Sequence, residues 1–361
     1  MSAPPELRAA ARPHDFARRE RQHRNQLKEE AMFFKTLAGI AFIGLAAGGA
    51  LAETKLDMTN EYEPNSIHGQ GDQFFADKVA ELSGNDVIIT LHLGGALGFK
   101  SKDNLDAVAD GVVPIADTLG GVLAGSDPIF LVSSLPFMAA NVEEARELYL
   151  AAKPAYAAFF EKNGQILLYA SPWPPSGLWA QKPVDTPSAL SGLKMRTYDA
   201  NGTRTLIEAG ASPIQLSWAD VVPQLATGGI EGVLTSAEGG VNAKFWEHLS
   251  HFTEINYALP LNFVHMNRDA FDDLDEAGRT AILEAAAAAD ARNWEALGAR
   301  VEGNYASLKE NGVVIAEEIS PELQAHLGAA ASAVIAEWRK KTGEAGEAIL
   351  SSYGAKIGRN F

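Results

Sequence analysis

The sequence has 361 residues, with 46 acidic against 30 basic side chains and a formal net charge of −16. No basic stripe is present, so nucleic acid is not an expected partner. Cysteine is absent, which excludes a lipid-anchored lipoprotein, a disulfide framework, thiol catalysis and thiolate metal sites. The length suits two domains.

The first 52 residues differ from the rest. Residues 1–31 are polar and rich in arginine, and Met32 begins a segment in which one lysine precedes an apolar run ending at Ala52. This pattern is typical of a secretory signal peptide, although a buried helix of the mature fold is an alternative. We predict an upstream extension at 1–31, a signal peptide at 32–52 with cleavage after Ala52, and a periplasmic protein.

After this leader, strand-like and helix-like segments alternate. We expect strands at 55–59, 86–93, 112–117, 166–170, 193–198, 212–215, 232–235 and 262–267. We expect a polar loop at 61–71 and helices at 73–83, 102–110, 142–163, 202–209, 218–227, 275–311 and 321–341, the third one broken at Pro154. The alternation predicts an α/β fold with largely parallel sheets.

The common signatures of catalysis are missing from the sequence. It has no Gly-x-Ser-x-Gly elbow, no phosphate loop and no dinucleotide fingerprint. His248 and His251 have a spacing that could share a metal, but no clear third ligand accompanies them. We therefore expect no enzymatic activity, no cofactor and no metal site.

The most informative block lies between Pro187 and Ser236. It contains the segment ALSGLKMR, which ends at Arg196, then GASP at 210–213, then WADVVPQLATGGIEG at 218–232. The order and spacing of these segments resemble the substrate-binding subunits of tripartite ATP-independent periplasmic (TRAP) transporters, the DctP family. A looser likeness extends over about 55–350.

This resemblance implies a two-lobed periplasmic binding protein of the class II type, with crossing segments and a long helix spanning both lobes. One lobe would comprise 53–176 plus 262–301, and the other 177–261 plus 302–361. A small organic acid would shift the protein from an open to a closed form. The closed form would then dock on the small and large membrane subunits of the transporter.

Arg196 is the expected anchor for the ligand. It lies near the end of an apolar strand, the edge at which α/β clefts place ligand groups. A guanidinium presents two parallel donors that match a carboxylate. A surface ion pair would explain the position alone equally well. The arginine at this motif position holds the ligand carboxylate in the family, so the resemblance assigns that role to Arg196.

Two departures from the family pattern indicate the kind of acid. Where many members carry a second arginine, this chain has the segment GLW, which ends at Trp179, and the polar stretch at 233–236 becomes VLTS. A dicarboxylate would need a second cation. Trp173, Trp179 and Trp218 instead offer flat apolar surfaces, although tryptophans are also common in cores. We expect a monocarboxylate with an apolar or aromatic body.

Further ligand contacts are expected mainly on loops that follow strands. The remaining candidates are Asp199 and Thr235 in the second lobe and Tyr62, His68, Phe99 and Asp117 in the first. Two other functions fit the same residues. One is a ligand-binding protein that serves a sensor or receptor, and the other is a periplasmic enzyme, such as a lyase that uses Asp117 or Asp199.

Overall fold

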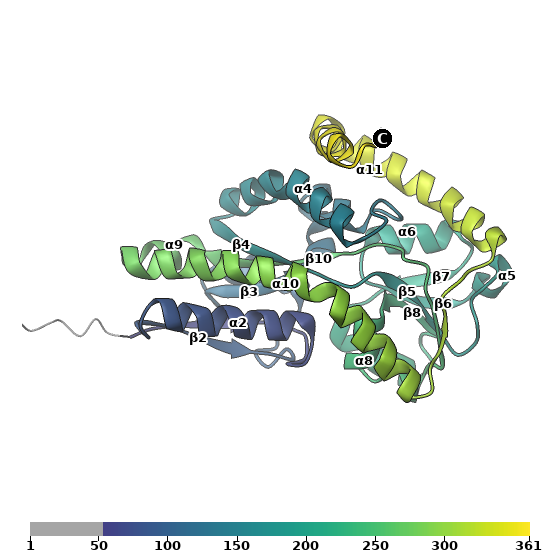
Figure 1. Cartoon of the computed structure of the whole chain (residues 1–361), viewed down its shortest axis with the longest axis horizontal. Helices are drawn as coiled ribbons and strands as arrows, with labels where there is room; N and C mark the ends of the chain where they lie inside the picture. Colours follow the sequence, from purple (N-terminus) through teal and green to yellow (C-terminus); the bar gives the residue numbers. More distant parts are fainter. Residues whose placement is uncertain (1–52) are drawn as a thin grey trace, which may run out of the picture. The chain divides into compact units, whose positions relative to one another are not determined.

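Helices and strands alternate along residues 53–361, the part of the chain that this computed structural model describes (Figure 1). The predicted upstream extension and signal peptide lie outside the described residues. The strands of 53–361 form two sheets, and this confirms the α/β class and the two-lobed architecture. No helix in this range combines the length and the apolar character needed to cross a bilayer.

The first sheet has the strand order β2-β1-β3-β10-β4. Its strands are β1 (Thr54–Thr59), β2 (Val87–His92), β3 (Ile115–Leu119), β4 (Gln165–Pro172) and β10 (Leu261–Asn267). β1 is parallel to β2 and β3, whereas β10 is antiparallel to both of its neighbours, β3 and β4. The chain therefore returns from the second lobe to insert a strand inside the first sheet.

The second sheet has the order β11-β9-β5-β8-β6-β7. Its strands are β5 (Ser176–Ala180), β6 (Lys194–Thr197), β7 (Ser212–Gln215), β8 (Gly232–Ser236), β9 (His251–Thr253) and β11 (Val314–Ala316). β6 is parallel to β7 and β8, but β5 is antiparallel to β8 and β9. The prediction of largely parallel sheets is therefore confirmed, with one exception in each sheet: β10 in the first and β5 in the second run against the other strands.

The helices cover these sheets. They are α2 (Ile67–Leu82), α3 (Asn104–Ala109), α4 (Val142–Lys162), α5 (Pro187–Leu190), α6 (Ala200–Glu208), α7 (Val221–Ala226), α8 (Ala237–Asn242), α9 (Arg268–Asp272), α10 (Glu276–Glu310) and α11 (Pro321–Ile357). Short 3-10 helices lie between them: η1 (Ser101–Asp103), η2 (Gly120–Gly125), η3 (Pro128–Ser134), η4 (Trp218–Asp220) and η5 (Phe245–Glu247).

Three helix predictions need correction. α2 begins inside the predicted polar loop, because the Ser66 side chain accepts a hydrogen bond from the Gly69 amide and caps the helix there. α4 continues through Pro154, since buried side chains on both sides of the proline hold the helix against the core. α11 extends to Ile357, and Gly343, at φ 56°, supplies the backbone conformation for a bend within it.

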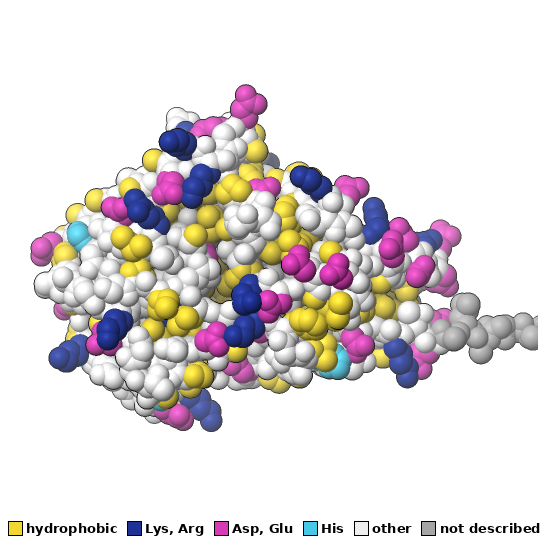
Figure 2. Space-filling model, turned by 180° about the vertical axis from the view of Figure 1, so that it is seen from behind, with side chains coloured by type: hydrophobic (Ala, Val, Ile, Leu, Met, Phe, Trp, Pro, Cys, Tyr) yellow, Lys and Arg dark blue, Asp and Glu magenta, His cyan; other side chains and the backbone are white. Residues whose placement is uncertain are grey.

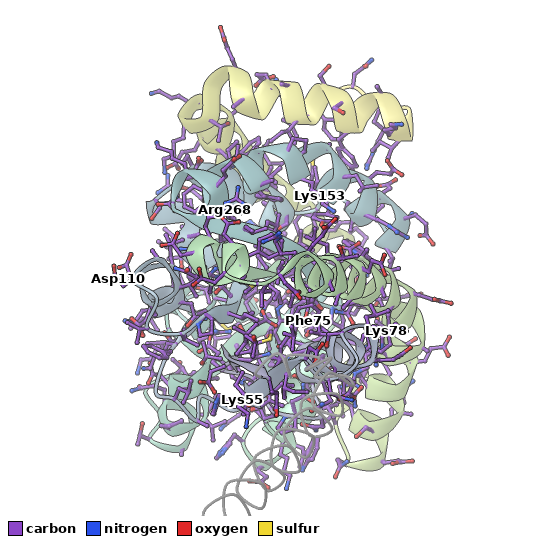
Figure 3. The ribbon with its side chains drawn as sticks, turned by 90° about the vertical axis from the view of Figure 1, so that its left-hand side faces the viewer. Lys55, Phe75, Lys78, Asp110, Lys153 and Arg268 are labelled. Atoms are coloured by element: carbon purple, nitrogen blue, oxygen red, sulfur yellow. The ribbon has the colours of Figure 1, made fainter. Side chains whose placement is uncertain are left out.

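One face of α2 packs into the core of the first lobe. Phe75 is fully buried among side chains of β1, β3 and α10, and Figure 3 places it in the interior, with Lys78 nearer the surface. α10 packs against α2 and β4 in this lobe and against α8 and β11 in the other. It is the long helix expected to span both lobes (Figure 1).

α11 also contributes to both lobes. Leu323 and Leu327 in its first half join the hydrophobic core of the second sheet. Trp338 and Tyr353 in its second half join the cluster around α4 and η3. The residue boundaries proposed for the lobes remain a prediction.

The surface carries charges of both signs. On the face in Figure 2, Lys and Arg side chains are scattered among Asp and Glu and do not gather in one stripe. This face therefore does not offer the continuous basic track that a nucleic acid needs.

We predict that Gly240 of α8 does not tolerate a side chain. A Cβ atom there would overlap the Trp179 ring, which is fully buried against Phe245 and Phe252 and cannot move aside. Gly240→Ala should lower the free energy of unfolding by about 1–3 kcal/mol.

Gly298 of α10 provides a matched control, because it has no atom within 4 Å of an added Cβ. Gly298→Ala should therefore raise this free energy by about 0.5–1 kcal/mol. Urea unfolding of both variants decides the matter, and two effects of the same sign would contradict the prediction.

Candidate ligand-binding site

A pocket lies where strand ends of the two sheets meet. Its empty space, including the part open to solvent, is about 310 Å³. Its lining is formed by Tyr62, Leu119, Trp173, Ser176, Arg196, Tyr198, Trp218, Thr235, Ser236 and Pro260. Leu119 ends β3, Ser236 ends β8, Arg196 lies next to the end of β6, and Tyr62 follows β1. The carboxyl ends of parallel strands from both lobes thus point into one pocket, as is usual for ligand sites in α/β proteins.

Arg196 is the cation of this pocket. Its side chain is only 3% exposed, and its Nε donates a hydrogen bond to the Leu216 carbonyl oxygen at 3.0 Å. Within 53–361, neither terminal guanidinium nitrogen donates to a protein acceptor, although both nitrogens are good donors. Burial lowers the pKa of Arg196, and the nearby Tyr62 and Glu61 oppose this effect. The guanidinium is therefore held at one nitrogen, and its other donors are free for a ligand.

Aromatic rings form the walls around this cation. The Arg196 guanidinium carbon lies 5.7 Å from the centroid of the Trp218 ring, a cation–π distance. Tyr62 meets Trp173 edge to face, with 4.9 Å between ring centroids. Trp218 Nε1 donates to the Glu63 carboxylate at 3.2 Å, which connects the second lobe to the loop after β1. The pocket is therefore apolar on its walls and charged at one point.

A buried polar network holds Trp173 from behind. Trp173 Nε1 donates to Asn262 Oδ1 at 2.8 Å, and Asn262 Nδ2 donates to Asp117 Oδ1 at 2.6 Å. Asn60 then connects Asp117 to Asp72. Burial raises the pKa of both carboxyls, and the Asp72 charge further raises that of Asp117. Asp117 therefore positions a pocket wall through Asn262 and does not line the pocket itself.

Five of the ten predicted site residues are brought together in the pocket. They are Tyr62, Trp173, Arg196, Trp218 and Thr235. Asp117 lies within β3 and not on a loop. His68 is buried in α2, where its ring packs on Trp173 with 4.2 Å between centroids, and burial lowers its pKa to about 3. Phe99 packs on the small cluster around α3.

Trp179 lies outside the pocket. Side chains alternate between the two faces of a strand, so Trp179 points to the face of β5 opposite to that of Ser176, which lines the pocket. The ring is fully buried, and its Nε1 donates to the Ser236 carbonyl oxygen at 3.2 Å. This placement removes the basis for treating Trp179 as an apolar substitute for a second cation.

Sequence reasoning missed half of the pocket. Leu119, Ser176, Tyr198, Ser236 and Pro260 were not among the candidates. Tyr198 lies two residues after Arg196. Because residues i and i+2 of a strand share one face, the sequence could have placed Tyr198 on the same face as Arg196. Ser176 could not be found in this way, because β5 was not among the expected strands.

Contacts on either side of the pocket hold the two lobes together. Glu238, at the start of α8, is fully buried and accepts a hydrogen bond from the Ile67 amide of α2 at 2.9 Å. The same carboxylate binds Arg300 of α10, with Nε–Oε2 at 2.7 Å. Lys100 pairs with Asp220 at 2.8 Å nearer the surface. The lobes are therefore in a closed arrangement over the pocket.

Comparisons with known proteins agree with this geometry. The family model described as bacterial extracellular solute-binding protein, family 7 (DctP), matches residues 58–341. The crystal structure of DctP7, a Bordetella pertussis extracytoplasmic solute receptor described as binding pyroglutamic acid, is 31% identical. The match covers 83% of this chain and 99% of that one, with a TM-score of 0.81.

Two further relatives are similar. A marine metagenome TRAP solute-binding protein, described as specific for pyroglutamate and crystallised with the co-purified compound, is 30% identical, with a TM-score of 0.81. That match covers 84% of this chain and 99% of that one. A protein of Verminephrobacter eiseniae named solute-binding protein is 24% identical over 300 residues, which are 82% of this chain and 88% of that one.

Asp199, the remaining candidate, caps α6, and we predict that it makes stability depend on pH. Its Oδ1 accepts from the Gly202 amide at 2.8 Å, while burial raises its pKa to about 6. Between about pH 4 and 6 the folded state binds more protons than the unfolded state, so stability falls as the pH rises through this window. Asp199→Asn keeps a good capping residue and removes the titration.

Asp199→Asn should therefore gain stability relative to the wild type, by up to about 3 kcal/mol, as the pH rises from 4 to 7. Urea unfolding of both proteins at several pH values measures this difference. The exposed Asp106→Asn of α3 serves as a control that should show no such trend. A constant difference between the wild type and Asp199→Asn would contradict the prediction.

Proposed function

We propose a function that rests on the family of this chain. The chain belongs to family 7 of the bacterial extracellular solute-binding proteins, the DctP family of TRAP transporter receptors. In our proposal, it captures a small carboxylate at Arg196 and delivers it to the small and large membrane subunits of a TRAP transporter. The observation that carries the proposal is a buried guanidinium whose terminal nitrogens have no protein partner among the described residues.

A buried cation of this kind favours an anionic ligand. Removing a charge from water is costly unless a partner of opposite charge replaces the water. A carboxylate matches the two parallel donors of a guanidinium in geometry as well as in charge. Since no carboxylate of residues 53–361 lies within salt-bridge distance of Arg196, the ligand is the group that completes the pair in this proposal.

The pocket walls support a compact ligand body. Trp173, Trp218 and Tyr62 bring flat apolar surfaces to the pocket, and Ser176 and Thr235 add hydroxyl groups. We therefore propose a monocarboxylate whose apolar body contacts these three rings. Trp179 takes no part in this contact. The two relatives at 30–31% identity that are described as binding pyroglutamate support a cyclic monocarboxylate of that class.

Arg196→Ala should weaken the binding of pyroglutamate by about 2–5 kcal/mol, which is a factor of about thirty or more, because the carboxylate loses its paired donors. Arg196→Lys should recover only part of this loss, since a point charge cannot reproduce the fork. Isothermal titration calorimetry measures both.

Arg204→Ala provides the matched control, because Arg204 lies half-exposed on α6 and pairs with Glu208. This variant should bind as the wild type does. The anchor role would be refuted by an Arg196→Ala protein with wild-type affinity. A thermal-shift panel of carboxylic acids and neutral sugars tests the ligand class separately, since a bound ligand stabilises the folded state by mass action.

We also propose that the chain is exported and loses residues 1–52. The charge of Lys35 followed by an apolar run and the segment ALA at 50–52 supports cleavage after Ala52. The mature protein should then begin at Glu53. Intact mass spectrometry of protein recovered from the periplasm of a Gram-negative host measures this, and an exported chain that retains residues 1–52 would disprove the cleavage.

A further inference from the structure

A second chamber adjoins the ligand pocket. Its empty space, including the part open to solvent, is about 590 Å³, and it shares Leu119, Arg196, Tyr198 and Trp218 with the first pocket. Glu61 is among the residues that line only the second chamber. The two cavities therefore have the Arg196 side chain in common, and Glu61 lines the one that adjoins the ligand pocket.

Glu61 is a buried carboxyl group, and one of its two oxygens has no partner among the described residues. The residue is 7% exposed, and its Oε2 atom has no hydrogen-bond partner within the described chain. Burial raises the pKa of Glu61, while hydrogen bonds from Ser101 and the charges of Arg196 and Lys100 act to lower it. A buried polar atom without a partner is unfavourable. The same atom becomes favourable when a ligand brings a donor to it.

Arg196 and Glu61 are the buried charged residues that line the two cavities, whereas Lys102, which also lines the second one, is an exposed side chain paired with Asp103. The arginine offers donors and a positive charge, whereas the glutamate offers an acceptor and a negative charge. A ligand with one carboxylate and a neutral N–H or O–H group complements both residues. A dicarboxylate would place its second charge near Glu61, where like charges repel.

We infer that Glu61 is the second recognition residue of this site: it accepts a hydrogen bond from an N–H or O–H group beside the ligand carboxylate and disfavours a second carboxylate. The inference rests on the proposed function, because it assumes that a carboxylate binds at Arg196. In this inference, a monocarboxylate is preferred for two reasons: the apolar rings contact its body, and Glu61 repels a second carboxylate. The substrate class is then a hydroxy, amido or lactam monocarboxylate.

A matched pair of ligands tests the hydrogen bond. Pyroglutamate carries a lactam N–H, and 5-oxotetrahydrofuran-2-carboxylate replaces it with a ring oxygen but keeps the ring, the carbonyl and the carboxylate. Calorimetry at pH 7.5 should show that the wild type binds the lactam at least about tenfold more tightly than the lactone. In Glu61→Ala this ratio should fall close to one.

A second variant tests the charge and keeps the shape. Glu61→Gln retains an oxygen acceptor, so its preference for the lactam should survive in part. Its affinity for glutarate should rise by about tenfold over the wild type, because the repelling charge is gone. Glu143→Gln removes the same charge from an exposed position on α4. It should change neither the preference for the lactam over the lactone nor the affinity for glutarate. Circular dichroism and thermal melting establish that each variant is folded.

The outcomes separate the two proposals. If the wild type binds both ligands equally, or if Glu61→Ala keeps the wild-type ratio, the role of Glu61 is overturned while Arg196 stands. If pyroglutamate does not bind but another acid does, a 2-hydroxy acid and its deoxy analogue replace the lactam and the lactone. The ratio of their affinities in the wild type and in Glu61→Ala then decides. If no carboxylate binds the wild type, or if Arg196→Ala binds as well as the wild type does, the proposed function fails and this inference fails with it.

Discussion

The site depends on one buried positive charge. Arg196 is removed from water at the end of β6, held by one backbone carbonyl at Nε and by the face of Trp218. Neither contact neutralises the cation. The surrounding structure orients the guanidinium, and the nearby Glu61 acts on it without forming an ion pair within the described residues. The pocket therefore presents a fixed cation whose terminal nitrogens are available to a ligand.

The closed arrangement of the lobes follows from the same site. Trp218 touches Arg196 and also donates to Glu63 on the loop of the other lobe, so the ring that faces the cation is itself a contact between the lobes. Glu238 reinforces this with hydrogen bonds to the start of α2 and to α10. Because hydrogen bonds to a buried charge are stronger than those at the surface, the Glu238 contact contributes more to closure than the half-exposed Lys100–Asp220 pair.

The sequence was sufficient for the elements with strong local patterns and for the choice of Arg196 as a residue of the pocket. Most strands and the long helix followed from apolar periodicity, and Arg196 followed from a motif whose spacing is local. Trp179 could not be placed, because the face of β5 that meets the cleft is set by pairing with β8 and β9, far away in the sequence. Glu61 lies in a segment that was expected to be a polar loop, and its burial arises only from tertiary packing.

The position of β10 in the first sheet has a consequence for the order of folding. β10 lies between β3 and β4, yet the chain reaches it only after the whole segment that forms most of the second sheet. The first lobe therefore cannot close its sheet until residues near 267 are available. Pairings between such distant segments slow folding. A nascent chain of this topology completes its first sheet only late in its synthesis, which suits a member of a family of extracellular solute-binding proteins.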